Sequence, residues 1–570
     1  MSSATDAPII ARPWWQQHLL TRALRRLPRL AVLLIIVGLT WRAVRYGVRF
    51  PVWGDEAFVA VNFIERDFAG LTRMPLQYTQ IVPLGFIWTE EAVSRALGFS
   101  EPALRLVPFA CGVAGLLLLW RLAGRMLDRR GALLAVAIAA AGYYLVRHAA
   151  EVKPYAGDFL VSVALTSLAW SIHTRGGSPA RWTALAAVAL GGAWLSFPAT
   201  FVAGGAELFL AWRALRQRNW AALAAVAAVG ALTGASSLAM YLTYAAPMAR
   251  NATQYWEMNM WQDSFPPMHE PWLLPLWLVQ VHAGAMFAHP SGGNSFGSTA
   301  TLVAVLAGCA ALWRGGRSRG AAPRQPRTAA PDGRAALGLL LLPFATSLAA
   351  AALGTYPYGG SARVALHLAP AVCLLAGAGI SYLLRRLLPP RLVPEGIRIA
   401  AVAMAAFAMV GAVIDVATPY KRHDHAHAKQ AARDLAARVA ASDRVLLGLA
   451  KEVGEADRPL PRIRGTDAAT IRYYLHTFLP TPLGWAPDEP TPYAGRTWLL
   501  FYSVPRLNQT DPDANEPARA AKFNAYLHKA RAVLGRPEYG EFVVPEPHAE
   551  AGDMRLKAYL FAAPPEAIAH

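Results

Sequence analysis

The stretch AALAAVAAVGALTGASSLAMYLTYAA, residues 221–246, decides the fold class of this chain, because its 26 residues include no charged side chain. A bilayer core about 30 Å thick is crossed by roughly 20 mostly apolar residues in a helix. Similar stretches recur along the first 416 residues, so we expect an α-helical polytopic membrane protein with about 11 transmembrane helices. The predicted helices cover residues 30–47, 103–125, 131–148, 158–174, 183–198, 199–213, 221–246, 299–313, 335–353, 364–384 and 397–416. Two of these predicted helices are short and meet at Phe197-Pro198, and the alternative for this pair is a single broken hairpin.

The composition of the 570 residues, 55% hydrophobic and 16% charged, is too apolar for an ordinary soluble domain. The net charge of +19 is concentrated in the membrane part: residues 1–416 contain 35 Lys and Arg against 18 Asp and Glu, whereas residues 417–570 contain 20 against 18. We therefore expect no nucleic-acid partner. The three cysteines, Cys111, Cys309 and Cys373, lie far apart in apolar stretches, so they predict no disulfide framework.

The basic residues also predict which loops face the cytoplasm, because Lys and Arg concentrate in the short loops on that side. With the Arg-rich segment 1–29 inside, alternation of the helices makes every predicted inner loop basic. This agreement requires that residues 76–98, which include Glu90 and Glu91, lie along the outer surface without crossing. Residues 48–102 then form one large outer loop of the transmembrane domain 30–416. The basic residues of the inner loops are Arg121, Arg125, Arg129, Arg130, Arg175, Arg181, Arg213, Arg216, Arg218, those of 314–334, Arg385, Arg386, Arg391 and Arg398.

Residues 417–570 differ from the rest, since 38 of these 154 residues are charged. Short alternating runs predict strands and longer amphipathic runs predict helices, so we expect a small α/β domain. With an odd number of membrane helices and an inner amino end, this domain is extracytoplasmic. The predicted strands are 444–449, 497–504, 541–544 and 556–562, and the predicted helices are 425–441 and 516–534.

Two adjacent acids, Asp55 and Glu56, follow the first predicted helix directly, close to the outer interface. Ionisable residues at or near bilayer depth are functional candidates, because a charge there is costly unless it lines a wet cavity. A carboxylate at this place can act as a general base or a metal ligand. The alternative is a solvated pair of acids in a surface loop.

The segment EVKPYAGD, residues 151–158, lies at the outer junction of the third and fourth predicted helices. It contains Glu151, Lys153, Tyr155 and Asp158, and Pro154 is placed where a helix can begin. Outer loops should be poor in basic residues, so topology does not explain the lysine. These side chains are therefore candidates for catalysis and substrate binding.

The segment YPYGGSAR, residues 356–363, carries a third group of candidates at the outer end of the tenth predicted helix. His367 follows Arg363 by one helical turn, so both should lie on one face. Tyr358 of the same segment is a further candidate. An arginine beside two glycines is suited to an anionic phosphate oxygen. Acids that can deprotonate an acceptor and cations that can hold a leaving phosphate together suggest group transfer from a lipid phosphate.

These motifs, in this order, resemble bacterial glycosyltransferases of the GT-C class, in the broad superfamily of protein O-mannosyltransferases and aminoarabinose transferases. The resemblance covers roughly residues 30–420. It rests on the Asp-Glu pair, QIVPLGF (80–86), GFSEPALRL (98–106) with Arg105, EVKPYAGD and YPYGGSAR.

The resemblance implies an integral-membrane enzyme that moves a sugar from a polyprenyl-phosphate-linked donor to a cell-envelope acceptor, a glycan, lipid or protein. Asp55 matches the favoured catalytic base, and Asp158 matches a second acidic position, with Glu56 beside the base. Lys153 and Arg363 fall where donor-phosphate contacts are expected. Further substrate contacts are expected from Glu151, Tyr155, Arg105, Tyr358 and His367.

Transfer with inversion needs one base and a stabilised leaving phosphate, without a second carboxylate as nucleophile. We expect no cofactor; some members of the superfamily use a divalent metal, but a metal site is not predicted here. The heavy use of Arg over Lys and the abundance of Ala suggest a high-GC bacterium. We expect a location in the bacterial inner membrane, with the amino end cytoplasmic. The alternatives are a secondary transporter or lipid-linked sugar flippase, and a non-catalytic assembly protein.

Overall fold

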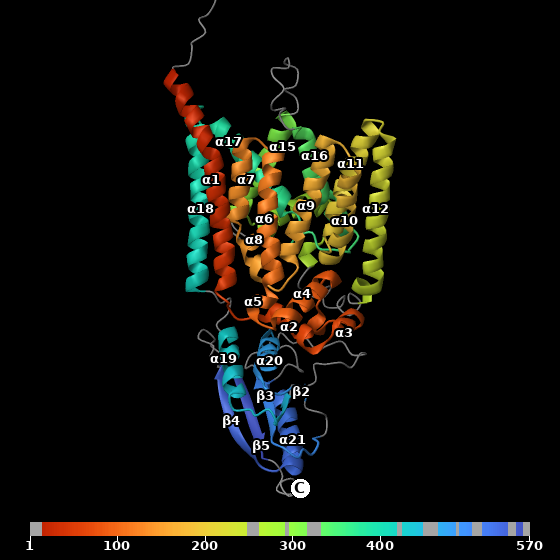
Figure 1. Ribbon diagram of the computed structural model, residues 1–570, viewed down its shortest axis with the longest axis vertical. Coiled ribbons are helices and arrows are strands. Elements are labelled where there is room, and N and C mark those ends of the chain that lie inside the picture. Colours follow the sequence, from red (N-terminus) through yellow and green to blue (C-terminus); the bar gives the residue numbers. More distant parts are fainter. Residues whose placement is uncertain are drawn as a thin grey trace, which may run out of the picture.

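The computed structural model describes residues 14–247, 262–290, 296–315, 332–418, 424–447, 466–485, 490–503, 516–544 and 554–562. Most of them form a bundle of long helices that lie side by side, and a sheet domain lies beyond one end of the bundle (Figure 1). The helices of the bundle are α1 (Trp14–Gly47), α6 (Leu106–Met126), α7 (Arg129–Ala140), α9 (Tyr155–Arg175), α10 (Pro179–Leu195), α11 (Ala199–Arg216), α12 (Trp220–Met240), α15 (Phe296–Gly315), α16 (Gly333–Ala352), α17 (Ala369–Leu387) and α18 (Val393–Ala417).

Among the described residues, eight helices are long and apolar enough to cross a membrane. A ninth crossing results if α7 and the segment Tyr143–Ala150, which is bent by 55° relative to α7, count as one. The predicted number of eleven is not confirmed. The difference lies in α10 and α11: α10 has only 17 residues, and the 18 residues of α11 include the charged Glu207, Arg213 and Arg216. At 1.5 Å per residue each spans about 26–27 Å, slightly less than a bilayer core of about 30 Å.

The helices of the bundle approach one another closely where small residues meet. Gly377 of α17 packs against the backbone of Gly131 and Ala135 in α7, and a Cβ atom at this position would collide with both. Gly379 packs in the same way against the carbonyl of Ala304 in α15. Close approach of this kind is the usual way in which membrane helices associate, because lipid supplies no hydrophobic driving force between them.

Five short helices join α1 to α6 and lie between the bundle and the sheet domain (Figure 1). Helix α4 (Leu84–Leu97) lies within residues 76–98, the segment that was predicted to lie along the outer surface without crossing. The five are α2 (Gly54–Glu65), α3 (Phe68–Arg73), the 3₁₀ turn η1 (Gln77–Thr79), α4 (Leu84–Leu97) and α5 (Glu101–Leu104). The remaining short helices are α8 (Tyr143–Arg147), η2 (His148–Ala150), η3 (Tyr241–Ala245), η5 (Gln262–Ser264), η6 (Pro271–Leu273), α14 (Leu274–Val281) and η7 (His282–Met286).

The C-terminal residues form a five-stranded sheet with the order β2-β1-β3-β5-β4. Strand β1 runs parallel to β2 and β3, whereas β5 is antiparallel to both of its neighbours. β2 and α20 were not among the predicted elements. The strands are β1 (Arg444–Leu447), β2 (Leu483–Trp485), β3 (Thr497–Ser503), β4 (Pro537–Val544) and β5 (Met554–Phe561), and the helices are α19 (Asp424–Ala436), α20 (Thr466–Phe478) and α21 (Glu516–Leu534).

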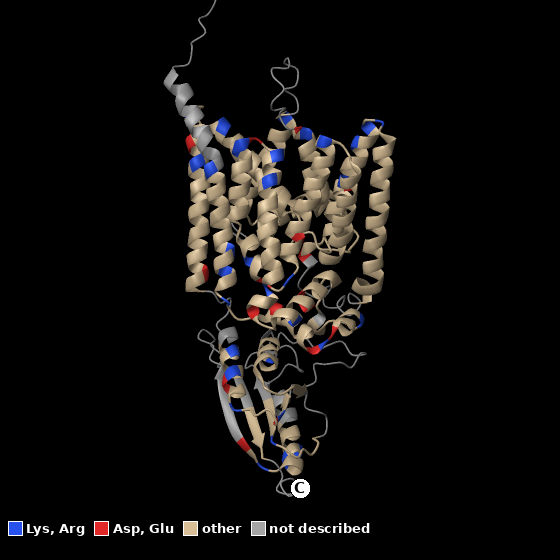
Figure 2. Ribbon diagram, in the orientation of Figure 1, with Lys and Arg blue, Asp and Glu red and all other residues tan. Residues whose placement is uncertain are grey.

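The charged residues are unevenly distributed along the bundle. Figure 2 shows Lys and Arg gathered at the end of the bundle that lies away from the sheet domain. Asp and Glu gather mainly at the opposite end, around α2 to α5. The acidic candidates of the sequence therefore lie at the end that faces the sheet domain.

Candidate active site

Asp55 lies in the first turn of α2, where its carboxylate points to the loop before α17. The Arg363 Nη1 atom donates a hydrogen bond to Asp55 Oδ2 over 2.7 Å, and both side chains are 25% exposed. This partial exposure distinguishes the pair from the other ion pairs around it, which are more deeply buried. Asp55 is therefore the predicted acid that a substrate can reach.

Lys153 lies beside this pair in the loop before α9. Its Nζ atom donates to Gln80 Oε1 over 2.6 Å, and the side chain is largely buried. Burial lowers the pKa of Lys153, although Asp55 opposes this effect, and Arg363 lowers it further. Tyr155 belongs to the same cluster, since it interacts electrostatically with both Asp55 and Arg363. The structure thus brings together Asp55, Lys153, Tyr155 and Arg363 from three separate segments.

Asp158 lies one helical turn after Tyr155, in the first turn of α9, and is almost fully buried. The Ser196 hydroxyl donates a hydrogen bond to its side chain, whereas its Oδ1 atom has no partner among the described residues. Asp158 also interacts electrostatically with Tyr155 and Tyr356. Asp158 therefore lies at the edge of the cluster, next to Tyr155.

Glu56 has a structural position that differs from the predicted catalytic one. Its carboxylate is completely buried and accepts hydrogen bonds from Arg105 Nε (2.8 Å) and Arg105 Nη2 (2.6 Å), and from the backbone N–H groups of Val152 (3.0 Å) and Trp53 (3.3 Å). Arg105 also donates to the Phe50 carbonyl over 2.6 Å. Both side chains hold α2 against α6 and the 151–154 loop. Their roles in catalysis and substrate binding stay predictions.

Glu151, a predicted substrate contact, is bound by two neighbouring side chains. It is buried, and it accepts hydrogen bonds from Arg147 Nε over 2.7 Å and His148 Nδ1 over 2.6 Å. Burial alone would raise the pKa of Glu151, but His148 and Arg147 outweigh it and hold the pKa well below its usual range. The carboxylate stays ionised and fixes the bent segment before Lys153.

His367 does not share a face with Arg363, because residues 362–368 form consecutive turns and α17 begins only at Ala369. Backbone bonds of the i→i+3 type, such as Leu368 N–H to the Ala365 carbonyl, replace the predicted helix. Pro370 explains this, since it has no N–H to bond the Leu366 carbonyl and its ring would collide with that carbonyl in a continuous helix. His367 is buried against the Ser347 hydroxyl (2.9 Å), and burial lowers its pKa to about 3.

Tyr358 also lies outside the cluster. It is buried under residues 262–290, where its hydroxyl and His282 Nε2 are 3.2 Å apart and its ring packs on Trp277. Its backbone N–H donates to the Ser264 carbonyl over 2.9 Å. The two predicted substrate contacts Tyr358 and His367 therefore stabilise the segment that carries Arg363 without joining it.

Two side chains near the site were missed by the sequence argument. Gln80 lies in a quoted motif, but only the structure shows that it binds Lys153. Glu90 of α4 is fully buried, and neither carboxylate oxygen has a partner among the described residues. Burial, with a smaller contribution from Glu56, raises the pKa of Glu90 well above its usual range. The sequence signal was its place in an otherwise apolar stretch.

Comparison with known proteins places this arrangement in a class. Residues 82–241, less than a third of the chain, match the family described as dolichyl-phosphate-mannose-protein mannosyltransferase. No match was found among curated proteins. The crystal structure of apo ArnT from Cupriavidus metallidurans superposes with a TM-score of 0.51 at 14% identity, over 92% of this chain and 97% of that one. The same protein bound to undecaprenyl phosphate gives a TM-score of 0.52 over the same shares, at 14% identity.

The shared fold and the family match over residues 82–241 support the predicted resemblance to GT-C class membrane glycosyltransferases. The chain shares the ArnT fold along nearly its whole length. Within the described residues, no group of three or more His, Cys, Asp or Glu side chains is arranged to hold a metal ion.

Proposed function

We propose that this protein transfers a sugar from a polyprenyl-phosphate-linked donor to a cell-envelope acceptor on the outer face of a bacterial inner membrane, with inversion. The observation that carries the proposal is the partly exposed pair of Asp55 and Arg363 beside Lys153. The undecaprenyl phosphate bound to ArnT, whose fold this chain shares, supports a donor of this chemical type. The basic end of the bundle in Figure 2 supports a cytoplasmic amino end.

In this reaction Asp55 acts as the general base. Its carboxylate takes the proton of the acceptor hydroxyl while the acceptor oxygen forms a bond to the anomeric carbon of the sugar. The bond between that carbon and the phosphate oxygen breaks, and the electron pair leaves with the polyprenyl phosphate. A phosphate leaves without a proton, so two cations suffice on its side, and these are Lys153 and Arg363.

The ion pair also holds the base in place until the donor binds. Without donor, Arg363 holds the Asp55 carboxylate. An arriving phosphate competes for the five N–H donors of the guanidinium and releases Asp55 toward the acceptor. Donor binding and activation of the base are thereby coupled through one side chain.

The test is a transfer assay with membranes that contain the protein and labelled undecaprenyl-phosphate mannose or undecaprenyl-phosphate aminoarabinose as donors. We expect release of free undecaprenyl phosphate with wild type and none with Asp55→Asn. The matched control is Asp67→Asn, because Asp67 caps α3 in the same outer segment and Asn is an equally good cap. Full activity of a folded Asp55→Asn variant would refute the assignment.

The alternative, a transporter or flippase for lipid-linked sugars, is tested in the same material. Reconstituted vesicles with labelled donor in one leaflet distinguish the two functions. Donor that moves to the other leaflet unchanged, with no free undecaprenyl phosphate and no effect of Asp55→Asn, would favour the flippase. The position of the acids at one end of the bundle, visible in Figure 2, argues for the transferase.

A further inference from the structure

The sheet domain and the segment that carries Asp55 share one hydrophobic core. Buried side chains of α2, including Ala57 and Val61, pack with Ile471 and Leu475 of α20 and continue into the strands of the sheet. The domain is therefore not tethered loosely to the end of the bundle. Helix α20 lies directly against the helix whose first turn holds the proposed base (Figure 1).

Tyr474 of α20 reaches the backbone just before that turn. Its hydroxyl accepts a hydrogen bond from the Val52 N–H over 2.7 Å and donates one to Glu101 Oε1 over 3.0 Å. Val52 precedes Asp55 by three residues, and both Val52 and Tyr474 are almost completely buried. Burial raises the pKa of Tyr474 well above its ordinary value, so the hydroxyl keeps the proton that it gives to Glu101.

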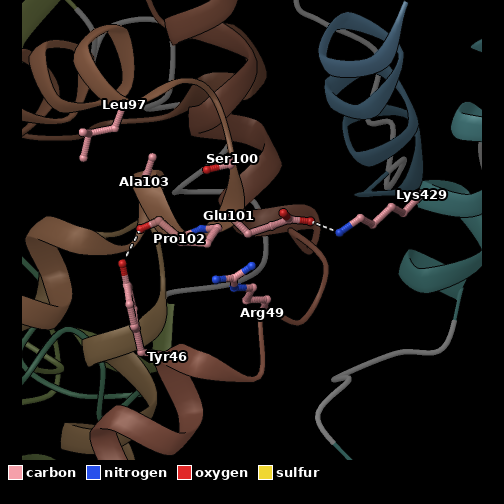
Figure 3. Close-up of a pocket in the computed structure, with 8 residues that line it drawn as sticks. All are labelled: Tyr46, Arg49, Leu97, Ser100, Glu101, Pro102, Ala103 and Lys429. Atoms are coloured by element: carbon pink, nitrogen blue, oxygen red, sulfur yellow. Dashed lines mark hydrogen bonds and ion pairs between the residues drawn. The ribbon is translucent and has the colours of Figure 1, made fainter.

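Glu101 links this contact to the rest of the site. Lys429 of α19 binds the same carboxylate, and Figure 3 shows Glu101 directed from α5 toward this lysine, beside a cleft of about 470 Å³. Helix α5 leads to Arg105, which donates to the carbonyls of Phe50 and Pro51. The backbone of residues 50–52 is therefore held on its carbonyl side by Arg105 and on its amide side by Tyr474.

We propose that Tyr474 is a positioning residue for Asp55, through which the C-terminal domain sets the geometry of the transfer site. This inference rests on the proposed function of Asp55 as base. Tyr474 touches neither Asp55 nor the expected substrate. It fixes the chain that enters α2, and thereby the direction in which the Asp55 carboxylate points.

Other residues of α20 attach the domain without touching residues 50–52, and they separate positioning from attachment. Arg472 and His476 both bind Glu65 at the far end of α2. Tyr473 donates from its hydroxyl to the Phe99 carbonyl over 2.9 Å and is as deeply buried as Tyr474. Tyr473→Phe is thus a matched control, since it removes one buried hydroxyl from the same helix.

The first measurement is hydrogen exchange of the purified full-length protein, followed by mass spectrometry on peptides that contain residues 50–57. In Tyr474→Phe the Val52 N–H loses its acceptor, so this segment should exchange faster than in wild type. In Tyr473→Phe it should exchange as in wild type. Equal exchange in both variants, or an unchanged segment in Tyr474→Phe, would overturn the inference.

The second measurement is turnover with the two labelled undecaprenyl-phosphate sugars. Tyr474→Phe should lower kcat about 10- to 100-fold, because a misplacement of about 1 Å can cost on the order of 10²-fold. Binding of undecaprenyl phosphate should stay within about twofold, since Lys153 and Arg363 are retained. Tyr473→Phe should keep its kcat. A loss of stability with normal kcat in Tyr474→Phe would mean a purely structural role.

If Tyr474→Phe fails to accumulate, Glu101→Gln replaces it, because Glu101 accepts the hydrogen bond that the Tyr474 hydroxyl donates. The exchange of residues 50–57 should then rise, and kcat should fall, by less than expected for Tyr474→Phe. The two proposals also fail in different ways. Absence of transfer in wild type would refute the proposed function, whereas the hydrogen exchange of residues 50–57 decides the role of Tyr474 without any donor.

Discussion

The Asp55 carboxylate lies 2.7 Å from the guanidinium of Arg363, a residue 308 positions further along the chain. The next residue, Glu56, is bound just as closely by Arg105, at 2.6 Å. The two pairs differ in exposure: 25% for both side chains of the first pair, and at most 1% for those of the second. We therefore expect adjacent carboxylates in one helical turn to have separate roles, one chemical and one structural.

This difference predicts opposite phenotypes for two neighbouring substitutions. Glu56→Gln should destabilise the protein by about 3–5 kcal/mol, because it leaves the Arg105 charge buried without its counter-ion. Asp55→Asn should change stability by less than about 1 kcal/mol, since its pair is partly solvated, and should abolish transfer. Thermal unfolding in detergent measures the first effect and the transfer assay the second. Similar unfolding of both variants would contradict the assignment.

Lys153 predicts the alkaline limit of activity. It must be charged to hold the leaving phosphate, and burial lowers its pKa from the ordinary value of about 10.4. Activity should therefore be full at lower pH and fall as the pH rises through this lowered pKa, earlier than for an exposed lysine. Lys153→Arg should move the fall to higher pH, because arginine stays protonated.

The control for this profile is the thermal stability of both proteins over the same pH range. A fall that occurs at the same pH in wild type and in Lys153→Arg would assign it to another group. Lys153→Met, which cannot carry charge, should be inactive at every pH.

Arg363 predicts the affinity for the lipid phosphate. Hydrogen bonds to charged groups contribute about 1.5–3 kcal/mol, so Arg363→Gln should bind undecaprenyl phosphate about 10- to 100-fold more weakly. The affinity of Arg363→Lys should lie between those of wild type and Arg363→Gln, because a lysine supplies a charge without the planar set of N–H donors of an arginine. Arg385→Gln is the control, since Arg385 pairs with Asp128 in the segment before α7, away from the site. Equal affinities for all variants would remove Arg363 from the donor site.

The sequence was sufficient to predict which candidate residues lie together at one end of the bundle. Asp55, Lys153 and Arg363 could be grouped because apolar stretches and basic loops fix which ends of the helices lie together. Their partners could not be predicted in the same way. The bond between Glu56 and Arg105 joins residues that are 49 positions apart, and hydropathy carries no information about such pairs.

The spacing argument for Arg363 and His367 was wrong for a local reason. An i, i+4 pair shares a face only in an α-helix, and residues 362–368 are turns that precede Pro370. Similarly, α20 was not predicted, although its Tyr474 contacts the chain before α2. The first error has a local cause, whereas the second concerns a helix whose buried side chains pack with those of α2 and the sheet.

Glu90 predicts a pH dependence of stability. Burial raises its pKa well above the usual value, so it is neutral in the folded protein over a range where an unfolded chain would ionise it. Its contribution to stability is therefore complete below the unfolded pKa of about 4.3 and is lost as the pH rises toward the folded pKa. Glu90→Gln, which stays neutral, should unfold at a higher temperature than wild type, with a difference that widens from about pH 5 upward.

Glu65 provides the opposite control for this experiment. Burial alone would raise the pKa of Glu65, but His476, Arg472 and Gln77 outweigh it and lower the pKa. Its contribution to stability is therefore present above the unfolded pKa and is lost only as the pH falls through the folded one. Glu65→Gln should unfold at a lower temperature than wild type at neutral pH, whereas Glu90→Gln should unfold at a higher one. If Glu90→Gln shows a constant difference from wild type at every pH, Glu90 is ionised in the folded protein and has a partner that balances its charge.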